Sequence, residues 1–265
     1  MTAAEKMTRL VEVLEKHDAL AIAVSGGVDS MVLAHVTQSH ARTAMTAFHA
    51  VSPAVPGLAT RRVKSHATRH GWALHLVDAE ELADPAYRNN PVNRCFYCKS
   101  RLYERIATGT GLRIASGTNI DDLGDYRPGL EAAKHHNVIH PFVEAGLRKA
   151  DIYAIANALG LDDLAALPAQ PCLASRIETG IRVDESALRF IENTEAALTT
   201  LLPEAGSTRC RITAEGVYVE CDTLPLGADR EHVERQMDAL CAQDRRRFAG
   251  MRPYRRGAAF LRVQE

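Results

Sequence analysis

The chain lacks any long apolar run and carries almost no excess charge. No hydrophobic stretch in its 265 residues approaches the roughly 20 that cross a bilayer as a helix. Residues 1–6 also lack the apolar core of a signal peptide. These absences predict a cytoplasmic protein with no membrane partner. The net charge of −1 lacks the basic excess that a broad nucleic-acid-binding face needs, so nucleic acid is not the expected partner.

Cysteine is scarce, and only two of the 6 cysteines lie close together. Cys95 and Cys98 form a CxxC pair, and the other four are isolated: Cys172, Cys210, Cys221 and Cys241. A structural zinc site usually needs a second close pair, which the sequence does not contain. In a cytosolic protein such thiols indicate metal binding or catalysis before disulfides. We assign no metal to any of the 11 histidines.

The most informative stretch is Ser25-Gly-Gly-Val-Asp-Ser30. It follows residues 19–24, whose apolar run predicts a buried parallel strand, and precedes a predicted helix that extends to about residue 39. A turn between strand and helix aims backbone N–H groups and the helix N-terminus at a phosphate. The sequence does not contain a Walker A motif, GxxxxGK[ST].

Each residue type in this loop suits an anion site. Gly26 and Gly27 let the backbone approach a phosphate without interference from a Cβ atom. The hydroxyl groups of Ser25 and Ser30 add hydrogen-bond donors. Asp29 is repelled by bare phosphate, so we expect it to face Mg²⁺ or to orient the loop. The alternative is an ordinary glycine turn at the start of a helix.

Strands and helices alternate along the first part of the chain. Further strands are predicted at 45–51, 73–77, 113–116 and 137–140, and helices at 4–17, 58–71, 98–108 and 147–160. This alternation predicts an α/β fold with a doubly wound parallel sheet. Ligands of such sheets bind beyond the carboxyl ends of the strands. The 25–30 loop, Ser52 and residues 117–127 are expected to meet there.

The pattern changes near residue 167. A helix at 184–202, a strand pair at 208–212 and 217–221, and a helix at 228–241 predict a smaller α+β module. We therefore expect a first domain at 1–167 and a second at 168–265. The basic tail that begins at Arg245 is read as a solvated surface without an assigned partner.

The polar, glycine-bounded stretch 117–129 follows a predicted strand. Its carboxylates could serve Mg²⁺, and its arginine could bind a phosphate; the residues concerned are Asp121, Asp122, Asp125 and Arg127. A solvated loop is the alternative.

Two stretches of the second domain could also carry chemistry. Cys172 stands between a proline and the Ser175-Arg176 pair, where the arginine could bind a phosphate or carboxylate and lower the pKa of the thiol. The alternative is a buried, inert thiol. Arg209 and Arg211 alternate along a strand and so share one face, where they clamp a substrate phosphate or form surface salt bridges.

Taken together, these motifs resemble the LarE-type sulfur transferases of the PP-loop ATP pyrophosphatase superfamily. The resemblance covers about residues 5–225. It rests on the 25–30 loop, residues 90–99, residues 117–129, residues 171–176 and the Arg209/Arg211 pair. The chain departs from the family pattern at residues 250–257, whose sequence differs from the usual C-terminal motif of the family.

The resemblance implies a mechanism and a cofactor set. ATP, with Mg²⁺, adenylylates a carboxylate of a pyridinium mononucleotide, and pyrophosphate leaves into the 25–30 loop. A sulfur atom then displaces AMP and gives a thiocarboxylate, in biosynthesis of the nickel-pincer nucleotide cofactor. The residues implied in ATP or substrate binding, beyond the loop itself, are Ser52, Gly117, Asn119, Asp125, Arg127, Ser175, Arg176, Arg209 and Arg211. Asp29 and Cys172 are the implied catalytic residues, and a homo-oligomer is expected.

Members of this family differ in the source of sulfur. One type sacrifices the sulfur of a single cysteine, at the position of Cys172. The other binds a [4Fe-4S] cluster through three cysteines, which leaves the fourth iron open. The presence of Cys95, Cys98 and Cys172 implies the cluster type.

Three other functions stay open. A tRNA thiolase of the same superfamily would also use three cysteines and a cluster. An amide-forming synthetase shares the glycine loop but needs none of the cysteines. A nucleotide-binding sensor would use the loop without catalysis.

Overall fold

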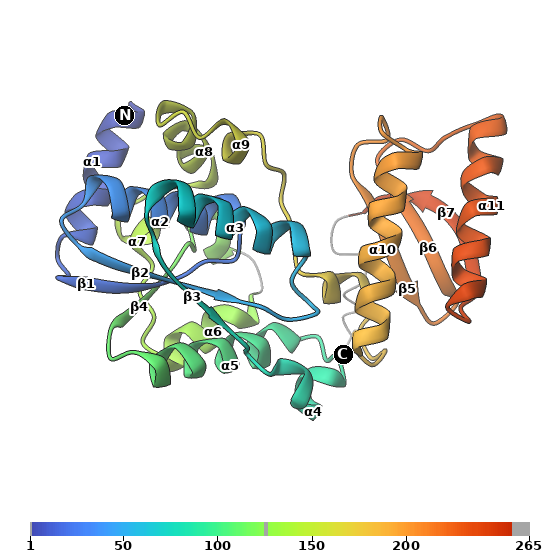
Figure 1. The fold of residues 1–265 in the computed structure, drawn as a ribbon, viewed down its shortest axis with the longest axis horizontal. Helices are drawn as coiled ribbons and strands as arrows, with labels where there is room; N and C mark the ends of the chain where they lie inside the picture. The colour runs from blue at the N-terminus through green and yellow to red at the C-terminus, as the bar shows by residue number, and fades with distance from the viewer. Residues whose placement is uncertain (1, 125–126, 256–265) are drawn as a thin grey trace. The chain divides into compact units, whose positions relative to one another are not determined.

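The computed structural model describes residues 2–124 and 127–255 and divides the chain into two compact units (Figure 1). The nucleotide-loop unit comprises Met1–Glu81 and Cys95–Gln170, and the C-terminal unit comprises Leu82–Arg94 and Pro171–Glu265. The segment 82–94, which the sequence analysis places in the first domain, packs with the second unit. The side-chain amide of Asn90 donates to the carbonyl oxygens of Glu178 and Ile181, at 2.8 and 2.9 Å, and so ties the segment to that unit.

The nucleotide-loop unit is built on a four-stranded sheet of order β3-β2-β1-β4, in which all neighbours are parallel. The strands are β1 (Ala19–Ala23), β2 (Ala44–Ala50), β3 (Ala73–Val77) and β4 (Arg113–Ser116). The predicted doubly wound α/β fold is therefore confirmed. The expected fifth strand at 137–140 is reduced to one parallel bridge between Ala115 and Ile139, because Pro141 begins a helix directly after it.

Helices cover both faces of this sheet (Figure 1). Leu20 and Ile22 of β1 face one layer, and Ala21 and Ala23 face the other, as the two-residue period of a strand requires. The first layer contains α1 (Ala3–Leu14), α2 (Val28–His40), α3 (Gly57–His70), α7 (Pro141–Glu144), α8 (Lys149–Ala158) and α9 (Asp162–Ala165). The second contains α5 (Arg94–Gly109) and α6 (Pro128–His135). The central strand β1, covered on both faces, is apolar throughout, whereas the edge strand β3 is largely exposed.

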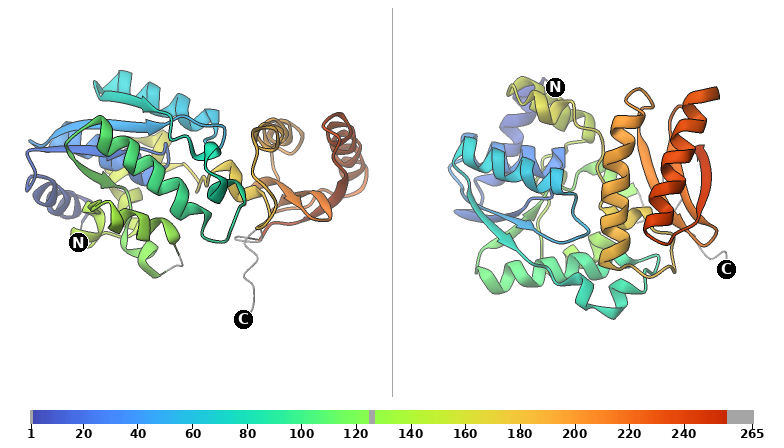
Figure 2. Two further views of the ribbon diagram at one scale, coloured as in Figure 1. Left: turned by 90° about the horizontal axis from the view of Figure 1, so that it is seen from below. Right: turned by 45° about the vertical axis from the view of Figure 1, so that its right-hand side comes forward.

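The C-terminal unit has a three-stranded sheet of order β5-β6-β7. Strands β5 (Thr208–Thr213) and β6 (Gly216–Cys221) form the predicted hairpin, and β7 (Phe248–Pro253) pairs parallel to β6. Helices α10 (Glu185–Leu201) and α11 (Gly227–Gln243) lie on the same face of this sheet (Figure 2). The sequence analysis missed β7, because a strand containing Gly250, Arg252 and Pro253 has poor intrinsic propensity and forms by pairing with β6.

Four short elements complete the described structure: a 3₁₀ turn at Glu81–Ala83, α4 (Pro85–Arg88), and two further 3₁₀ turns at Ile120–Gly124 and Leu173–Arg176. Among the helices of the described residues, none is long and apolar enough to cross a bilayer.

Candidate functional site

The predicted phosphate loop connects the end of β1 to the start of α2, as the sequence indicated. Its two serines close the loop on itself. The backbone N–H of Ser25 donates to Ser30 Oγ at 3.0 Å, and Ser30 Oγ donates to the carbonyl oxygen of Gly27 at 3.1 Å. Ser30 is buried and Ser25 is exposed. Ser30 therefore braces the loop, whereas Ser25 lies where a ligand can reach it.

Two glycines of the site have no room for a side chain. Gly26 has φ +84°, and a Cβ there would lie 2.9 Å from the Cβ and the carbonyl oxygen of Ala59 in α3. Gly117, directly after β4, packs its Cα against the start of α2. A Cβ at Gly117 would lie 2.6 Å from the backbone nitrogen of Ser30 and 2.8 Å from the carbonyl carbon of Asp29. The end of β4 is thus pressed against the phosphate loop, as the rule for parallel sheets predicts.

Asp29 meets a cation that the sequence analysis missed. The Lys149 ammonium, at the first residue of α8, donates to Asp29 Oδ2 at 2.6 Å, and the Asn119 amide lies 3.4 Å from Asp29 Oδ1. The backbone N–H of Lys149 donates to Asp121 Oδ2 at 2.9 Å. No local pattern marks Lys149, which reaches the loop only because α8 packs beside α2.

The carboxylates of the 117–127 segment are engaged by neighbouring cations and backbone groups. Asp121 accepts from the Arg148 guanidinium at 2.8 Å, and Asp122 pairs with Arg127 at 2.7 Å. The backbone N–H of Lys149, and then Arg148, hold the pKa of Asp121 below its usual value. Asp125 lies outside the described residues.

Two further observations concern the predicted ligand-binding residues. Within the described ranges, no three His, Cys, Asp or Glu side chains are grouped so as to hold a metal ion. Ser52, after β2, is used locally, since its hydroxyl accepts from the backbone N–H of Ala54 at 3.2 Å.

Cys95 and Cys98 lie in the first turns of α5, and both are half-buried. The helix begins at Arg94 rather than near residue 98, so both thiols lie within the reach of its N-terminal dipole. Three residues apart on one helix, the two thiols lie on the same face, as two ligands of one metal centre would.

In the C-terminal unit, Cys172 directly precedes the 3₁₀ turn at Leu173–Arg176 and is half-buried. Its carbonyl oxygen accepts from Ser175 Oγ at 2.7 Å and from Arg176 Nη1 at 3.1 Å. Arg176 also forms two 3.0 Å bonds to the carboxylate of Glu195 and is itself buried. Ser175 and Arg176 thus hold the backbone of the cysteine turn.

Arg209 and Arg211 share a strand face but have different surroundings. Arg211 is buried, pairs with Glu220 at 2.8 Å and donates to the carbonyl oxygen of Ser175 at 2.5 Å. Arg209 donates to the carbonyl oxygen of Thr208, and no carboxylate within the described chain is hydrogen-bonded to it. Burial, and then the charge of Arg176, lower the pKa of Arg209. Arg209 lies over the ring of Tyr254 and has no hydrogen-bonded carboxylate among the described residues, so it is the better anion-binding candidate of the two.

The other three cysteines are fully buried in the core of the C-terminal unit: Cys210, Cys221 and Cys241. Burial raises the pKa of all three thiols, that of Cys241 to about 11. They are inert structural thiols. The three cysteines of the predicted site are the three that solvent can reach.

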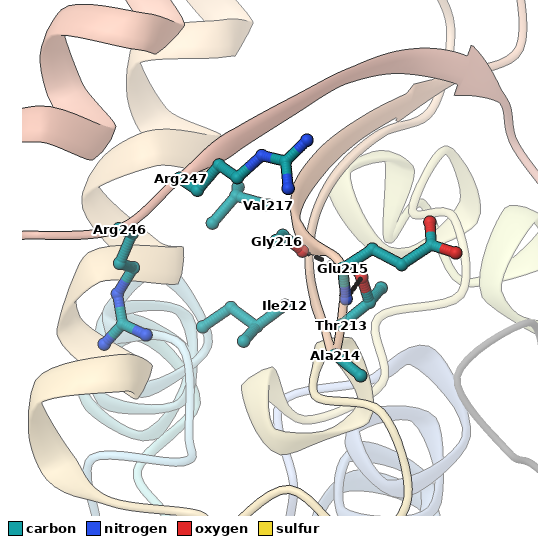
Figure 3. Close-up of a pocket in the computed structure, with 8 residues that line it drawn as sticks. All are labelled: Ile212, Thr213, Ala214, Glu215, Gly216, Val217, Arg246 and Arg247. Carbon is teal, nitrogen blue, oxygen red and sulfur yellow. Dashed lines mark hydrogen bonds between the residues drawn. The ribbon is translucent and has the colours of Figure 1, made fainter.

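A hollow of about 320 Å³ lies at the β5–β6 turn (Figure 3). The hydroxyl of Thr213 donates to the carbonyl oxygen of Gly216, and the side chains of Arg246 and Arg247 lie on the opposite side. None of the predicted site residues lines this hollow, so we do not assign it to the site.

No family model matches the chain. It is 35% identical to the uncharacterized protein slr1717 of Synechocystis over 214 residues, which are 79% of this chain and 78% of that protein. It is 30% identical to a pyridinium-3,5-bisthiocarboxylic acid mononucleotide synthase of Lactiplantibacillus plantarum over 60% of each chain. It is 29% identical to a tRNA-cytidine(32) 2-sulfurtransferase of Syntrophotalea carbinolica, over 60% of this chain and 68% of that protein.

Proposed function

We propose that this chain, which belongs to the same family as the slr1717 protein of Synechocystis, is an ATP-dependent sulfurtransferase of the PP-loop type, as its similarity to the two named sulfur-transfer enzymes supports. In the proposed reaction, a carboxylate oxygen of the acceptor attacks the α-phosphorus of ATP and pyrophosphate leaves. A sulfur nucleophile then attacks the acyl carbon, AMP departs, and the product is a thiocarboxylate. Adenylylation is required because a carboxylate oxygen is otherwise a poor leaving group.

The observation that carries this proposal is the construction of the phosphate loop. Three kinds of hydrogen-bond donor lie at the phosphate loop: the backbone N–H groups at the start of α2, the exposed hydroxyl of Ser25 and the Lys149 ammonium. Such a set of donors suits a pyrophosphate leaving group. Asp29, beside Lys149, is the group that we expect to contact Mg²⁺ when ATP is bound.

The acceptor that we propose is a carboxylate-bearing pyridinium mononucleotide, as in the relative named for such a product. Arg209 would bind its phosphate, and a role in making a nickel-pincer nucleotide cofactor follows from this choice. The relative named as a tRNA sulfurtransferase makes a tRNA the second candidate acceptor. A gel-shift assay with tRNA separates the two, because only a tRNA enzyme would bind it.

Three cysteines fit the proposed source of sulfur. Cys95, Cys98 and Cys172 would hold a [4Fe-4S] cluster, which when bound supplies a sulfide for transfer. The fit rests on the donor set: two thiols one turn apart at a helix start and a third on a braced turn, all partly exposed. Without a cluster, Cys172 would itself be the sulfur donor.

The loop is tested by replacing Asp29 with Asn and Ser30 with Ala. We expect each variant to release pyrophosphate at least about tenfold more slowly, the loss that about 1.4 kcal/mol of transition-state stabilisation produces. Circular dichroism should show an unchanged fold. Wild-type rates in both variants would exclude the loop as the pyrophosphate site.

A further inference from the structure

Helix α3 contacts the phosphate loop through a residue to which no role has been assigned. Arg62 Nη1 donates to the carbonyl oxygen of Gly26 at 2.7 Å, and the same nitrogen donates to Gln170 Oε1 at 3.0 Å. Both acceptors belong to the nucleotide-loop unit. Arg62 is half-buried, and an arginine keeps its charge at neutral pH.

The carbonyl of Gly26 belongs to the peptide that supplies the N–H of Gly27. In a trans peptide the carbonyl and the N–H point in opposite directions, so fixing one fixes the other. The N–H of Gly27 points toward Ser25 Oγ, 3.3 Å away, on the ligand side of the loop.

Within the loop, the other hydrogen bond described for this peptide is the longer one from the Gly27 N–H to Ser25 Oγ, at 3.3 Å. Gly26 and Gly27 lack Cβ atoms, so the 26–27 peptide can rotate at little steric cost. Close contact with Ala59 leaves no room for a side chain at Gly26, but this contact does not fix the direction of the Gly26 carbonyl. A rotated peptide would direct its carbonyl oxygen at the anion, which is repulsive.

We propose that Arg62 is a positioning residue that holds the Gly26–Gly27 peptide so that its N–H faces the bound pyrophosphate. Gln170 Oε1 accepts from the same Nη1 nitrogen and so helps to hold the guanidinium in place. The inference rests on the proposed function of the loop, and it assigns Arg62 a directional role rather than that of a general positive charge.

The test is calorimetric binding of inorganic pyrophosphate with Mg²⁺ to the full chain, which needs neither an acceptor nor a sulfur source. We expect Arg62→Ala to weaken binding by on the order of tenfold to a hundredfold, as expected for loss of a charged hydrogen bond. Arg62→Lys should restore only part of the affinity, since an ammonium lacks the planar fork of donors. Gln170→Ala should have a smaller effect than Arg62→Ala.

Arg61→Ala is the matched control, because Arg61 is exposed on the same helix and has the same charge. It should change affinity by less than about twofold, as is usual for a screened surface charge. Arg62→Ala with wild-type affinity, or full restoration by Arg62→Lys, would overturn the inference and leave the proposed function intact. A wild-type chain that binds no pyrophosphate would overturn both.

Discussion

Gly117 lies far from the phosphate loop in the sequence but contacts it in the fold, and so helps to set the shape of the loop. The glycine follows β4, and its Cα rests on the backbone of Asp29 and Ser30. Because the obstructing atoms belong to the backbone, they cannot move aside as a flexible side chain would. The close approach therefore requires glycine, independently of any ligand.

We expect Gly117→Ala to weaken pyrophosphate binding strongly and to lower the melting temperature, because the added methyl displaces the first turn of α2. Gly111→Ala is the control, since a Cβ there meets nothing within 4 Å. Calorimetric binding and thermal unfolding of both variants provide the measurement. Equal affinities in the two variants would contradict the close contact.

Arg209 and Arg211 lie two residues apart on strand β5, and their roles can be separated by experiment. Arg211→Ala removes one partner of a buried ion pair, so we expect the free energy of unfolding to fall by about 3 kcal/mol. Arg209→Ala should leave stability nearly unchanged and raise the KM for the acceptor.

Urea unfolding and acceptor kinetics test this separation, and ATP affinity should not change in either variant. Arg235→Ala, at an exposed ion pair, serves as the control for removing a positive charge from this unit. If Arg209→Ala lowers ATP affinity as much as acceptor affinity, the assignment of Arg209 to the acceptor is wrong.

At the scale of elements, α2 and α3 meet through a cluster of histidines. His35 and His40 lie on α2, and His66 and His70 on α3. The ring centroids of His35 and His70 are 4.6 Å apart, and the ring centroids of His66 and His70 are 5.4 Å apart. Asp163 of α9 bonds to His66 at 2.7 Å. Burial, and then the neighbouring histidines, lower the pKa of His35 to about 4.

This shift makes stability depend on pH. In the folded chain His35 stays neutral down to about pH 4, whereas in the unfolded chain it gains a proton near its ordinary value of 6.5. The unfolded state therefore binds more protons between these values, and the free energy of unfolding falls as the pH drops from about 6.5 to about 4. The loss from His35 is on the order of 3 kcal/mol.

Replacing His35 with Leu should flatten the pH profile of stability in this window. His232→Leu, at an exposed position of α11, should keep the wild-type profile. Chemical unfolding at a series of pH values measures both. Parallel profiles for His35→Leu and wild type would show that His35 does not titrate as the packing requires.

At the scale of the whole molecule, the three cysteines of the proposed function are far apart along the chain. Cys95 and Cys98 belong to the nucleotide-loop unit, and Cys172 belongs to the C-terminal unit. The proposed pyrophosphate loop lies in the first unit, and Arg209, proposed to bind the acceptor, lies in the second.

We expect anaerobically reconstituted wild-type protein to contain iron and sulfide, and each of Cys95→Ala, Cys98→Ala and Cys172→Ala to lose most of the iron. Cys241→Ala should retain it, because that thiol lies in the core of the C-terminal unit. Iron and sulfide analysis gives the result. A Cys172→Ala protein with wild-type iron would exclude Cys172 as a ligand.

The sequence by itself determined most elements of the first unit and the location of the loop. Continuous apolar runs and glycine or proline at helix ends are local signals, so the four-stranded parallel sheet and the start of α2 followed from them, whereas β7 did not. Glycine and serine at 25–30 also have local roles, which a short motif can reveal.

Tertiary structure decided which charges are available. Arg176 and Arg211 look like anion binders in the sequence, yet Glu195 and Glu220 engage them, at separations of 19 and 9 residues. Lys149 and Arg62 reach the loop from helices distant in the sequence, and no spacing rule marks either. An ion pair depends on where folded elements meet, and that is set by packing of the whole chain rather than by any local pattern.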